Sequence, residues 1–224
     1  MNRPDAVIFD VVETLFPLEP LRSRLIAAGL PGTMLETWFA SFLRDAFALE
    51  IAGGYRPFGE IAAAALARLL RAVTGRADDA AIATIMSGFA LLDPHEDVAP
   101  AFDLLAQEGV RIAALSNGSA KIATALFERA GLRGMLEAVI SIDEVRRWKP
   151  NAAVYRHAVA RLGLAPDRVA LIAAHAWDLE GAKRAGLMTG YVARGGMPPH
   201  AAMMPPDVEG ATLTETVRNL LKTI

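Results

Sequence analysis

Short apolar runs alternate with longer amphipathic stretches along most of the chain. Runs of this kind are typical of buried strands, and the amphipathic stretches are typical of helices that cover a sheet. The predicted strands lie at residues 6–10, 110–115, 138–140, 169–173 and 189–193. The predicted helices between and after them lie at residues 99–108, 119–130, 151–162, 179–185 and 212–223. Strands that alternate with helices predict an α/β fold, a doubly wound parallel sheet with a Rossmann-like core.

A block without strand-like alternation interrupts this pattern directly after the first strand. Residues 17–92 carry apolar positions at helical spacing, with a break at Gly53-Gly54 and Pro57. An aromatic stripe at residues 38–47 indicates the interior of this block, and a block that faces a site would share the stripe with a substrate. We therefore predict a helical cap at residues 17–96, inserted into a core of residues 1–16 and 97–224.

The composition narrows the class of protein. With 53% hydrophobic and 21% charged residues, the chain of 224 residues is expected to be globular rather than disordered. The net charge of −2 gives no support to nucleic-acid binding, and the absence of cysteine excludes disulfides and thiolate metal sites. The first strand begins too early to leave room for a secretory signal, and no uncharged apolar stretch is long enough to span a membrane. We expect a soluble, cytoplasmic protein without a nucleic-acid or membrane partner.

Polar residues follow the predicted strands or begin the predicted helices. Asp10 and Thr14 follow the first strand, Ser116-Asn117 the second, Lys149 precedes a helix, and Asp178 follows the fourth strand. Because right-handed crossovers bring the carboxyl ends of parallel strands to one edge, we expect these side chains to converge there.

Each of these side chains has a chemical use and a structural alternative. Asp10 is a candidate nucleophile, and Lys149 supplies the positive charge that keeps a carboxylate ionised. Ser116-Asn117 offers donors for an anion at a helix start, and Asp178 is placed to orient Lys149 or to activate water. The alternatives are a turn cap for Asp10, a surface position for Lys149, and helix caps for the other two sites. His175 and Trp177 flank Asp178, and a lone histidine is more often structural than catalytic.

Four motifs occur in order: Phe9-Asp10-x-x-x-Thr14-Leu15, Ser116-Asn117-Gly118, Lys149-Pro150 and Trp177-Asp178-x-x-Gly181-Ala182. Together they resemble the motifs of the haloacid dehalogenase superfamily, over nearly the whole chain. Phosphatases of that superfamily typically carry additional acids where this chain has Val12 and Ala174. Magnesium requires several hard oxygen ligands, which argues against that branch. The sequence is more similar to the L-2-haloacid dehalogenases, a resemblance that implies no metal and no cofactor.

The resemblance also implies a mechanism and a role for each residue. Asp10 would displace halide from a 2-halocarboxylate, and water would then cleave the resulting ester with help from Asp178 and Lys149. The substrate-binding residues would be Thr14, Ser116, Asn117, Tyr155, His175, Trp177 and Val11. Among them, Ser116 and the backbone N–H groups that begin at Val11 would hold the substrate carboxylate, and Asn117 would cradle the halide. Thr14 and Tyr155 would position Asp10 and the substrate. A homodimer is a further implication.

Several positions depart from the pattern of the branch. Glu13 replaces a glycine and Val12 a larger group, and His175 replaces an asparagine. The halide-binding arginine expected two residues after Thr37-Trp38 is Ala40 here, and Arg44 is the nearest arginine, which would compensate if the cap helix were shifted. Three alternatives therefore stay open. They are a metal-dependent phosphatase or phosphonatase, a non-catalytic binding protein, and a hydrolase that opens a strained-ring amino acid by the same attack.

Overall fold

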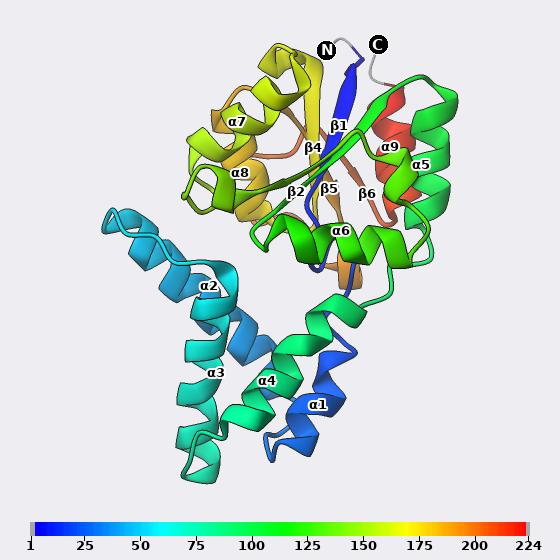
Figure 1. Cartoon of the computed structure of the whole chain (residues 1–224). Helices are drawn as coiled ribbons and strands as arrows, with labels where there is room; N and C mark the ends of the chain where they lie inside the picture. Colours follow the sequence, from blue (N-terminus) through cyan, green and yellow to red (C-terminus); the bar gives the residue numbers. More distant parts are fainter. Residues whose placement is uncertain (1–2, 223–224) are drawn as a thin grey trace.

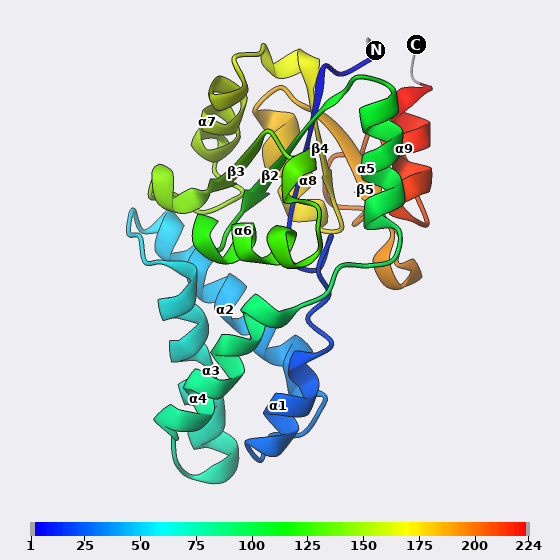
Figure 2. The same cartoon turned by 45° about the vertical axis from the view of Figure 1, so that its right-hand side comes forward.

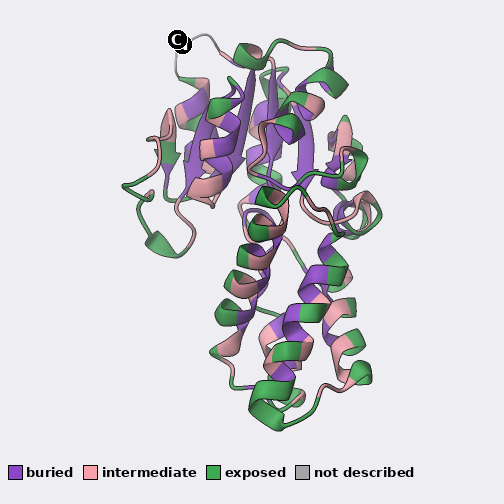
Figure 3. Cartoon of the chain, turned by 90° about the vertical axis from the view of Figure 1, so that its left-hand side faces the viewer, coloured by how far each residue is buried: buried purple, intermediate pink, exposed green. Residues whose placement is uncertain are grey.

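The computed structural model describes residues 3–222, and its centre is a six-stranded parallel sheet in the order β3-β2-β1-β4-β5-β6. The strands are β1 (Ala6–Phe9), β2 (Arg111–Ser116), β3 (Ala138–Ser141), β4 (Val169–Ala173), β5 (Met188–Val192) and β6 (Val208–Gly210). β1, β4 and β5 are buried along their whole length. Figure 3 shows most of the sheet in the purple of buried residues. This is the expected pattern for a parallel sheet covered on both faces, so the predicted doubly wound fold is confirmed.

Helices cover both faces of this sheet. They are α5 (Val98–Gln107), α6 (Ala120–Arg129), α7 (Ala152–Leu162), α8 (Ala176–Arg184) and α9 (Leu213–Leu221). α7 packs on α8, and α5 packs on α9 at the opposite face (Figures 1 and 2). In the central strand β1, Phe9 lies opposite Ala114 of β2 and Ile172 of β4. This register brings the residues that follow all three strands to the same edge.

The insert, residues 17–96, lies beyond that edge (Figure 1). Its helices are α1 (Leu21–Ala27), α2 (Met34–Ile51), α3 (Phe58–Thr74) and α4 (Asp79–Ser87), followed by a 3₁₀ turn at Gly88–Leu91. The aromatic stripe holds α2 and α3 together, since Trp38 is fully buried and its indole N–H donates to the carbonyl oxygen of Ala62 at 2.8 Å. Phe42 packs edge-on against both Trp38 and Phe58.

The structure differs from the predicted elements in three places. The predicted continuation of α4 to residue 92 is a 3₁₀ turn. β6 was not predicted, because its three residues lack an apolar run. α8 begins at Ala176, three residues earlier than predicted, so Asp178 lies in its first turn and does not cap it. Residue 223 of the last predicted helix lies outside the described residues. None of the helices within residues 3–222 is both long and apolar enough to cross a membrane.

Candidate active site

Three buried charges meet at the carboxyl edge of the sheet. The ammonium nitrogen Nζ of Lys149 lies 2.8 Å from Oδ1 of Asp10 and 2.8 Å from Oδ2 of Asp178. Lys149 and Asp178 are 0% exposed and Asp10 is 5% exposed. The predicted convergence of these residues is therefore observed, over a sequence separation of 139 residues between Asp10 and Lys149. A single ammonium group is shared by two carboxylates, with a net charge of −1.

This arrangement keeps Asp10 ionised. Burial alone would raise the pKa of the Asp10 carboxyl, but the positive charge of Lys149 and the hydrogen bond with His175 outweigh it and hold that pKa well below its ordinary value. Burial would lower the pKa of Lys149, and the two carboxylates reverse that effect and raise it. Asp178 has a raised pKa, because its burial and the charge of Asp10 outweigh the attraction of Lys149. The result is an anionic nucleophile beside a firmly protonated lysine.

Two hydroxyl groups fix the orientation of the acids. Thr14 donates from Oγ1 to Oδ2 of Asp10 at 2.7 Å, and the same oxygen accepts the backbone N–H of Ala174 at 2.9 Å. Tyr155 donates to Oδ1 of Asp178 at 2.5 Å, and burial followed by the charge of Asp178 raises the pKa of its hydroxyl well above the ordinary value. Both oxygens of Asp178 therefore have a partner, and this acid holds Lys149 from behind.

Donors for an anion lie on the other side of Asp10. The Oγ of Ser116 accepts the backbone N–H of Gly118 at 2.9 Å, which leaves its hydroxyl proton free to donate. The backbone N–H groups of Val11 and Val12 donate to no protein acceptor within residues 3–222. Asn117 accepts the backbone N–H of Lys149 with Oδ1 at 3.3 Å. Ser116 and Asn117 thus link the second strand to the lysine loop and to the anion donors.

A cavity of about 20 Å³, about the size needed for one water molecule, lies in front of Asp10. Its lining residues are Asp10, Val12, Phe39, Leu43, Phe58, Ser116, Asn117, Gly118, His175 and Trp177. Phe39, Leu43 and Phe58 come from the insert, and the others come from the core. Lys149, Asp178 and Tyr155 do not line it, so they act on Asp10 from the interior of the protein.

His175 is the titratable side chain beside Asp10 in this cavity. Its Nδ1 lies 3.3 Å from Oδ2 of Asp10, and its ring lies between those of Phe39 and Trp177. Because an ionised carboxylate only accepts hydrogen bonds, Nδ1 carries the proton in this contact. In this tautomer Nε2 is the ring nitrogen that can accept a hydrogen bond.

Comparison with known proteins agrees with this geometry. Residues 4–186 match the sequence profile of the haloacid dehalogenase-like hydrolases. The chain belongs to this family. The resemblance stated from the four motifs is thereby confirmed.

Several relatives of the haloacid dehalogenase-like family are named dehalogenases. The (S)-2-haloacid dehalogenase of Xanthobacter autotrophicus is 30% identical over 191 residues, 84% of this chain and 75% of that protein. The (S)-2-haloacid dehalogenase 4A of Burkholderia cepacia is 31% identical over 140 residues, 62% of this chain and 61% of that protein, so the match spans less than two thirds of its length. A solved L-2-haloacid dehalogenase from Xanthobacter autotrophicus, with chloropropionic acid covalently bound, superposes with a TM-score of 0.90 at 25% identity, covering 99% of this chain and 100% of that one.

The position at which the branch carries a halide-binding arginine lies outside the cavity. Ala40 is exposed on α2 and does not line the cavity, and α2 instead presents Phe39 and Leu43 to Asp10. Arg44, the nearest arginine, does not line the cavity either. Arg44 pairs with Asp45 on another face of α2, because one residue of helix turns a side chain by about 100° from Leu43.

Glu13 occupies a backbone conformation that explains the family's usual glycine. Its φ angle is +66°, in the left-handed region where side chains are strained. The carboxylate accepts the backbone N–H of Leu18, and burial raises its pKa. Glu13 therefore holds the turn after Asp10 by a side-chain contact that a glycine does not have.

The sequence prediction missed six residues of the site, which are Val12, Phe39, Leu43, Glu50, Phe58 and Gly118. Phe39 and Leu43 belong to the aromatic stripe at residues 38–47, and Phe58 begins the next helix, where helical spacing shows a buried face but does not distinguish a cavity wall from a core. Val12 was noted only as a departure from the pattern of the branch. Gly118 was noted only as part of a motif. Glu50 reaches from α2 to the backbone N–H of Trp148 at 2.9 Å, and no local pattern signals it.

Within residues 3–222, no group of three or more histidine, aspartate and glutamate side chains is arranged to hold a metal ion.

Proposed function

We propose that this protein hydrolyses short 2-haloalkanoic acids through an ester formed on Asp10. The observation that carries the proposal is the contact of the Lys149 ammonium with Asp10 and Asp178 at 2.8 Å each, behind a carboxylate that faces a small cavity. The lysine occupies the place between the two acids and supplies the positive charge there. The named activities of the relatives support the same reaction.

In the first step, a carboxylate oxygen of Asp10 attacks the α-carbon of the substrate from the side opposite the halogen. The carbon–halogen bond breaks, the halide leaves with the electron pair, and the α-carbon is inverted. The substrate carboxylate is held by the Ser116 hydroxyl and the free N–H groups of Val11 and Val12. Thr14 holds the attacking carboxylate in a fixed orientation.

In the second step, water adds to the carboxyl carbon of the Asp10 ester. The bond between that carbon and the alkyl oxygen breaks, the leaving oxygen takes up one proton of the water, and the other proton is released to the solvent. The products are a 2-hydroxy acid and the regenerated carboxylate. We assign the acceptance of the water proton to His175, because it lines the cavity beside Asp10 while both oxygens of Asp178 are occupied. Asp178 and Tyr155 then keep Lys149 in place during both steps.

The experiment is the release of halide from 2-chloropropionate and from monohaloacetates, by the wild type and by Asp10→Asn. We expect release that depends on Asp10 and persists after a metal chelator is added. A metal-dependent phosphatase would instead release phosphate from phosphate esters only when magnesium is supplied. A non-catalytic binding protein would release neither product. Either of these results would overturn the proposal.

A second candidate function follows from the residues of the insert that would face a departing halide in the cavity. The insert contributes only Phe39, Leu43 and Phe58 there, without a cationic group to stabilise a departing halide. Loss of one such contact costs about 2–4 kcal/mol, or ~10²–10³ in rate. Opening of a strained-ring 2-amino acid does not require a halide site. Asp10 would attack a ring carbon bonded to nitrogen, and the carbon–nitrogen bond would break toward a protonated amine. A product heavier by one water, formed without halide, would favour this candidate.

Three further expectations accompany the proposed reaction. The insert at residues 17–96 acts as a cap, since its side chains complete the cavity of the core. The chain forms a homodimer, which equilibrium sedimentation would test. The reaction takes place in the cytoplasm, which localisation of the tagged full chain would test.

A further inference from the structure

A second and larger cavity lies beside the one that contains Asp10. Its volume is about 400 Å³, within the range of ~300–1,000 Å³ that small-molecule sites usually have. The two cavities share four lining residues, Val12, Phe58, Ser116 and Gly118. The larger cavity therefore begins where the substrate carboxylate is proposed to bind.

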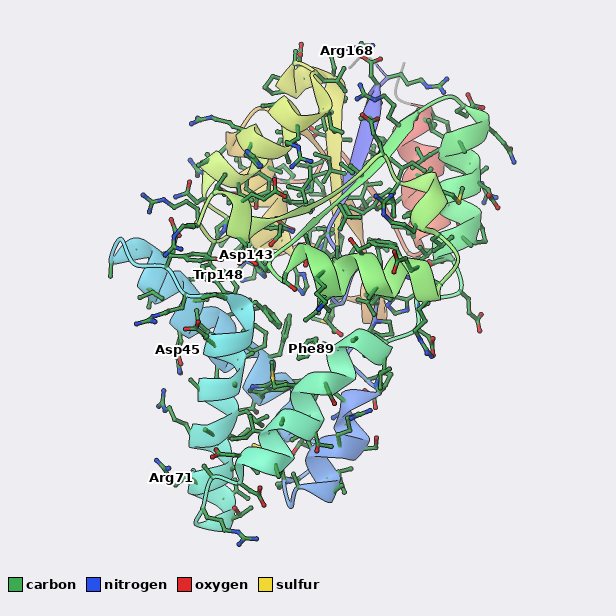
Figure 4. The ribbon with its side chains drawn as sticks, in the orientation of Figure 1. Asp45, Arg71, Phe89, Asp143, Trp148 and Arg168 are labelled. Carbon is green, nitrogen blue, oxygen red and sulfur yellow. The ribbon has the colours of Figure 1, made fainter. Side chains whose placement is uncertain are left out.

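The larger cavity is formed between the core and the insert. One wall is α6, with Ile122, Ala123 and Leu126, and the facing wall includes Met86 and Phe89 of the insert. Figure 4 shows Phe89 on the insert near this junction and Asp143 on the facing part of the core. All five of the wall residues are apolar, so the cavity favours an uncharged occupant.

The charged groups of this cavity are two carboxylates, Glu60 and Asp143. The Glu60 side chain is 58% exposed and lies 3.5 Å from Arg56, and Asp143 accepts the hydroxyl of Tyr55. A second carboxylate on the occupant would be repelled by both acids. The occupant that fits is an uncharged hydrocarbon chain.

Val12 lies two residues after the nucleophile Asp10, and its side chain lines both cavities. Its isopropyl group is small, and a larger aromatic group at the same position would occupy more of the space between the two cavities.

We propose that the larger cavity binds the hydrocarbon side chain of the substrate, so that the substrate range extends beyond the short 2-haloalkanoic acids and favours those with several carbons beyond the β-carbon. This inference rests on the proposed function, because it takes Asp10 and Ser116 as the reaction site. It places the specificity of the enzyme in Val12, Ile122, Ala123 and Leu126. The residues of α6 contact the hydrocarbon chain of the substrate, and the small side chain of Val12 leaves room for it.

The test uses the wild-type protein and two series of ligands. The first series is unreactive, the straight-chain acids propanoate, hexanoate and octanoate, measured by calorimetry. The second series is the matching 2-bromo acids, measured by halide release. We expect the affinity to rise about fourfold per added methylene group, which is what burial of a CH₂ provides. We expect kcat/KM for the bromo acids to rise in parallel.

Variants locate the effect in this cavity. Ala123→Phe and Val12→Phe fill it, and Ile122→Glu places a charge in its wall, at a residue 38% exposed that tolerates a polar group. All three should abolish the gain with chain length. Ala125→Phe, two residues further along α6 and outside the cavity, is the matched control and should retain the gain.

The outcomes separate this inference from the proposed function. Activity on 2-chloropropionate without any gain along either series would overturn the inference and leave the reaction intact. A gain in the affinity of the unreactive acids that Ala123→Phe removes, without halide release from any haloacid, would support the cavity and overturn the reaction. A gain that survives all three variants would show that the chain binds elsewhere and would overturn the inference.

Discussion

Asp10 keeps its negative charge inside the protein because three donors surround it. Lys149, Thr14 and His175 lie between 2.7 and 3.3 Å from its two oxygens. Lys149 contributes a full positive charge, and Thr14 and His175 contribute hydrogen bonds that fix the orientation of the carboxylate. The same environment that makes Asp10 a nucleophile at neutral pH also makes its ionisation part of the stability of the fold.

The lowered pKa of Asp10 predicts a pH dependence of stability. The group is ionised in the folded state at pH values where it is protonated in the unfolded chain, so its contribution is present above its ordinary pKa of 3.8 and is lost as the pH falls toward the lower folded value. Asp178, with its raised pKa, acts in the opposite sense. We expect the free energy of unfolding of the wild type to fall more steeply below pH 3.8 than that of Asp10→Asn, by at most about 1.4 kcal/mol per pH unit. Urea unfolding between pH 2.5 and 6 measures both slopes, and parallel slopes would contradict the assigned shift.

His175 predicts a separation of the two chemical steps. If His175 accepts the proton of the attacking water, the His175→Ala variant should still form the ester on Asp10. The rate of ester hydrolysis should then fall by about 10²–10⁴-fold. Mass spectrometry of the protein after rapid mixing with substrate should then show the intact chain carrying the mass of the alkyl group. His175→Asn, which keeps a donor toward Asp10 but has no titratable group, is the matched control and should accumulate the same species. Equal slowing of both steps, without accumulation, would assign His175 to positioning.

At the scale of elements, the loop before α7 connects the insert to the catalytic lysine. The Glu50 side chain, 9% exposed, accepts the backbone N–H of Trp148 at 2.9 Å and the Asn151 amide at 2.7 Å. These two residues flank Lys149-Pro150. The indole N–H of Trp148 in turn donates to the carbonyl oxygen of Arg56 at 3.0 Å, so two segments of the insert hold this loop.

Glu50 should therefore position Lys149 without touching the substrate. Glu50→Ala leaves the Trp148 N–H and the Asn151 amide without their acceptor, and we expect kcat to fall about tenfold or more with a smaller change in KM. Glu50→Gln keeps one acceptor oxygen and should restore most of kcat. A loss of stability in both variants without a difference in kcat would indicate a purely structural contact.

The elements show why part of the site was predictable. Strands β1 and β4 are continuous apolar runs, and β2 is apolar between Arg111 and Ser116. The polar residues at the ends of these strands must meet once the sheet is parallel. This reasoning placed Asp10, Ser116, Lys149 and Asp178 correctly. It could not fix the rotation of α2 about its axis. A stripe of apolar and aromatic residues does not show which of two neighbouring side chains faces Asp10. Phe39, rather than position 40, occupies that place.

Contacts between distant segments were not predictable from the sequence. Glu50 and Asn151 are 101 residues apart, and neither carries a local pattern that indicates the other. The early start of α8 has a similar cause. The stretch before Asp178 has no strong capping residue, and the side chain of His175, the residue before the helix, contacts Asp10 instead of capping it.

At the scale of the whole molecule, the reaction site lies between two layers of different origin. The core supplies every charged group, and the insert supplies apolar walls at Phe39, Leu43 and Phe58. This division keeps water largely away from a buried anion, where the electrostatic effect of Lys149 is strongest. It also allows the insert to change the substrate without any change to the nucleophile.

The most direct measurement follows the oxygen atom that reaches the product. A single turnover in ¹⁸O-labelled water, with enzyme in excess, should give a 2-hydroxy acid without label and an Asp10 carboxylate that carries it, since water attacks the carboxyl carbon of the ester. Mass spectrometry of the peptide that contains Asp10 detects this label. Label that appears in the product on the first turnover, with Asp10 unlabelled, would mean direct attack of water on the substrate and would contradict the account.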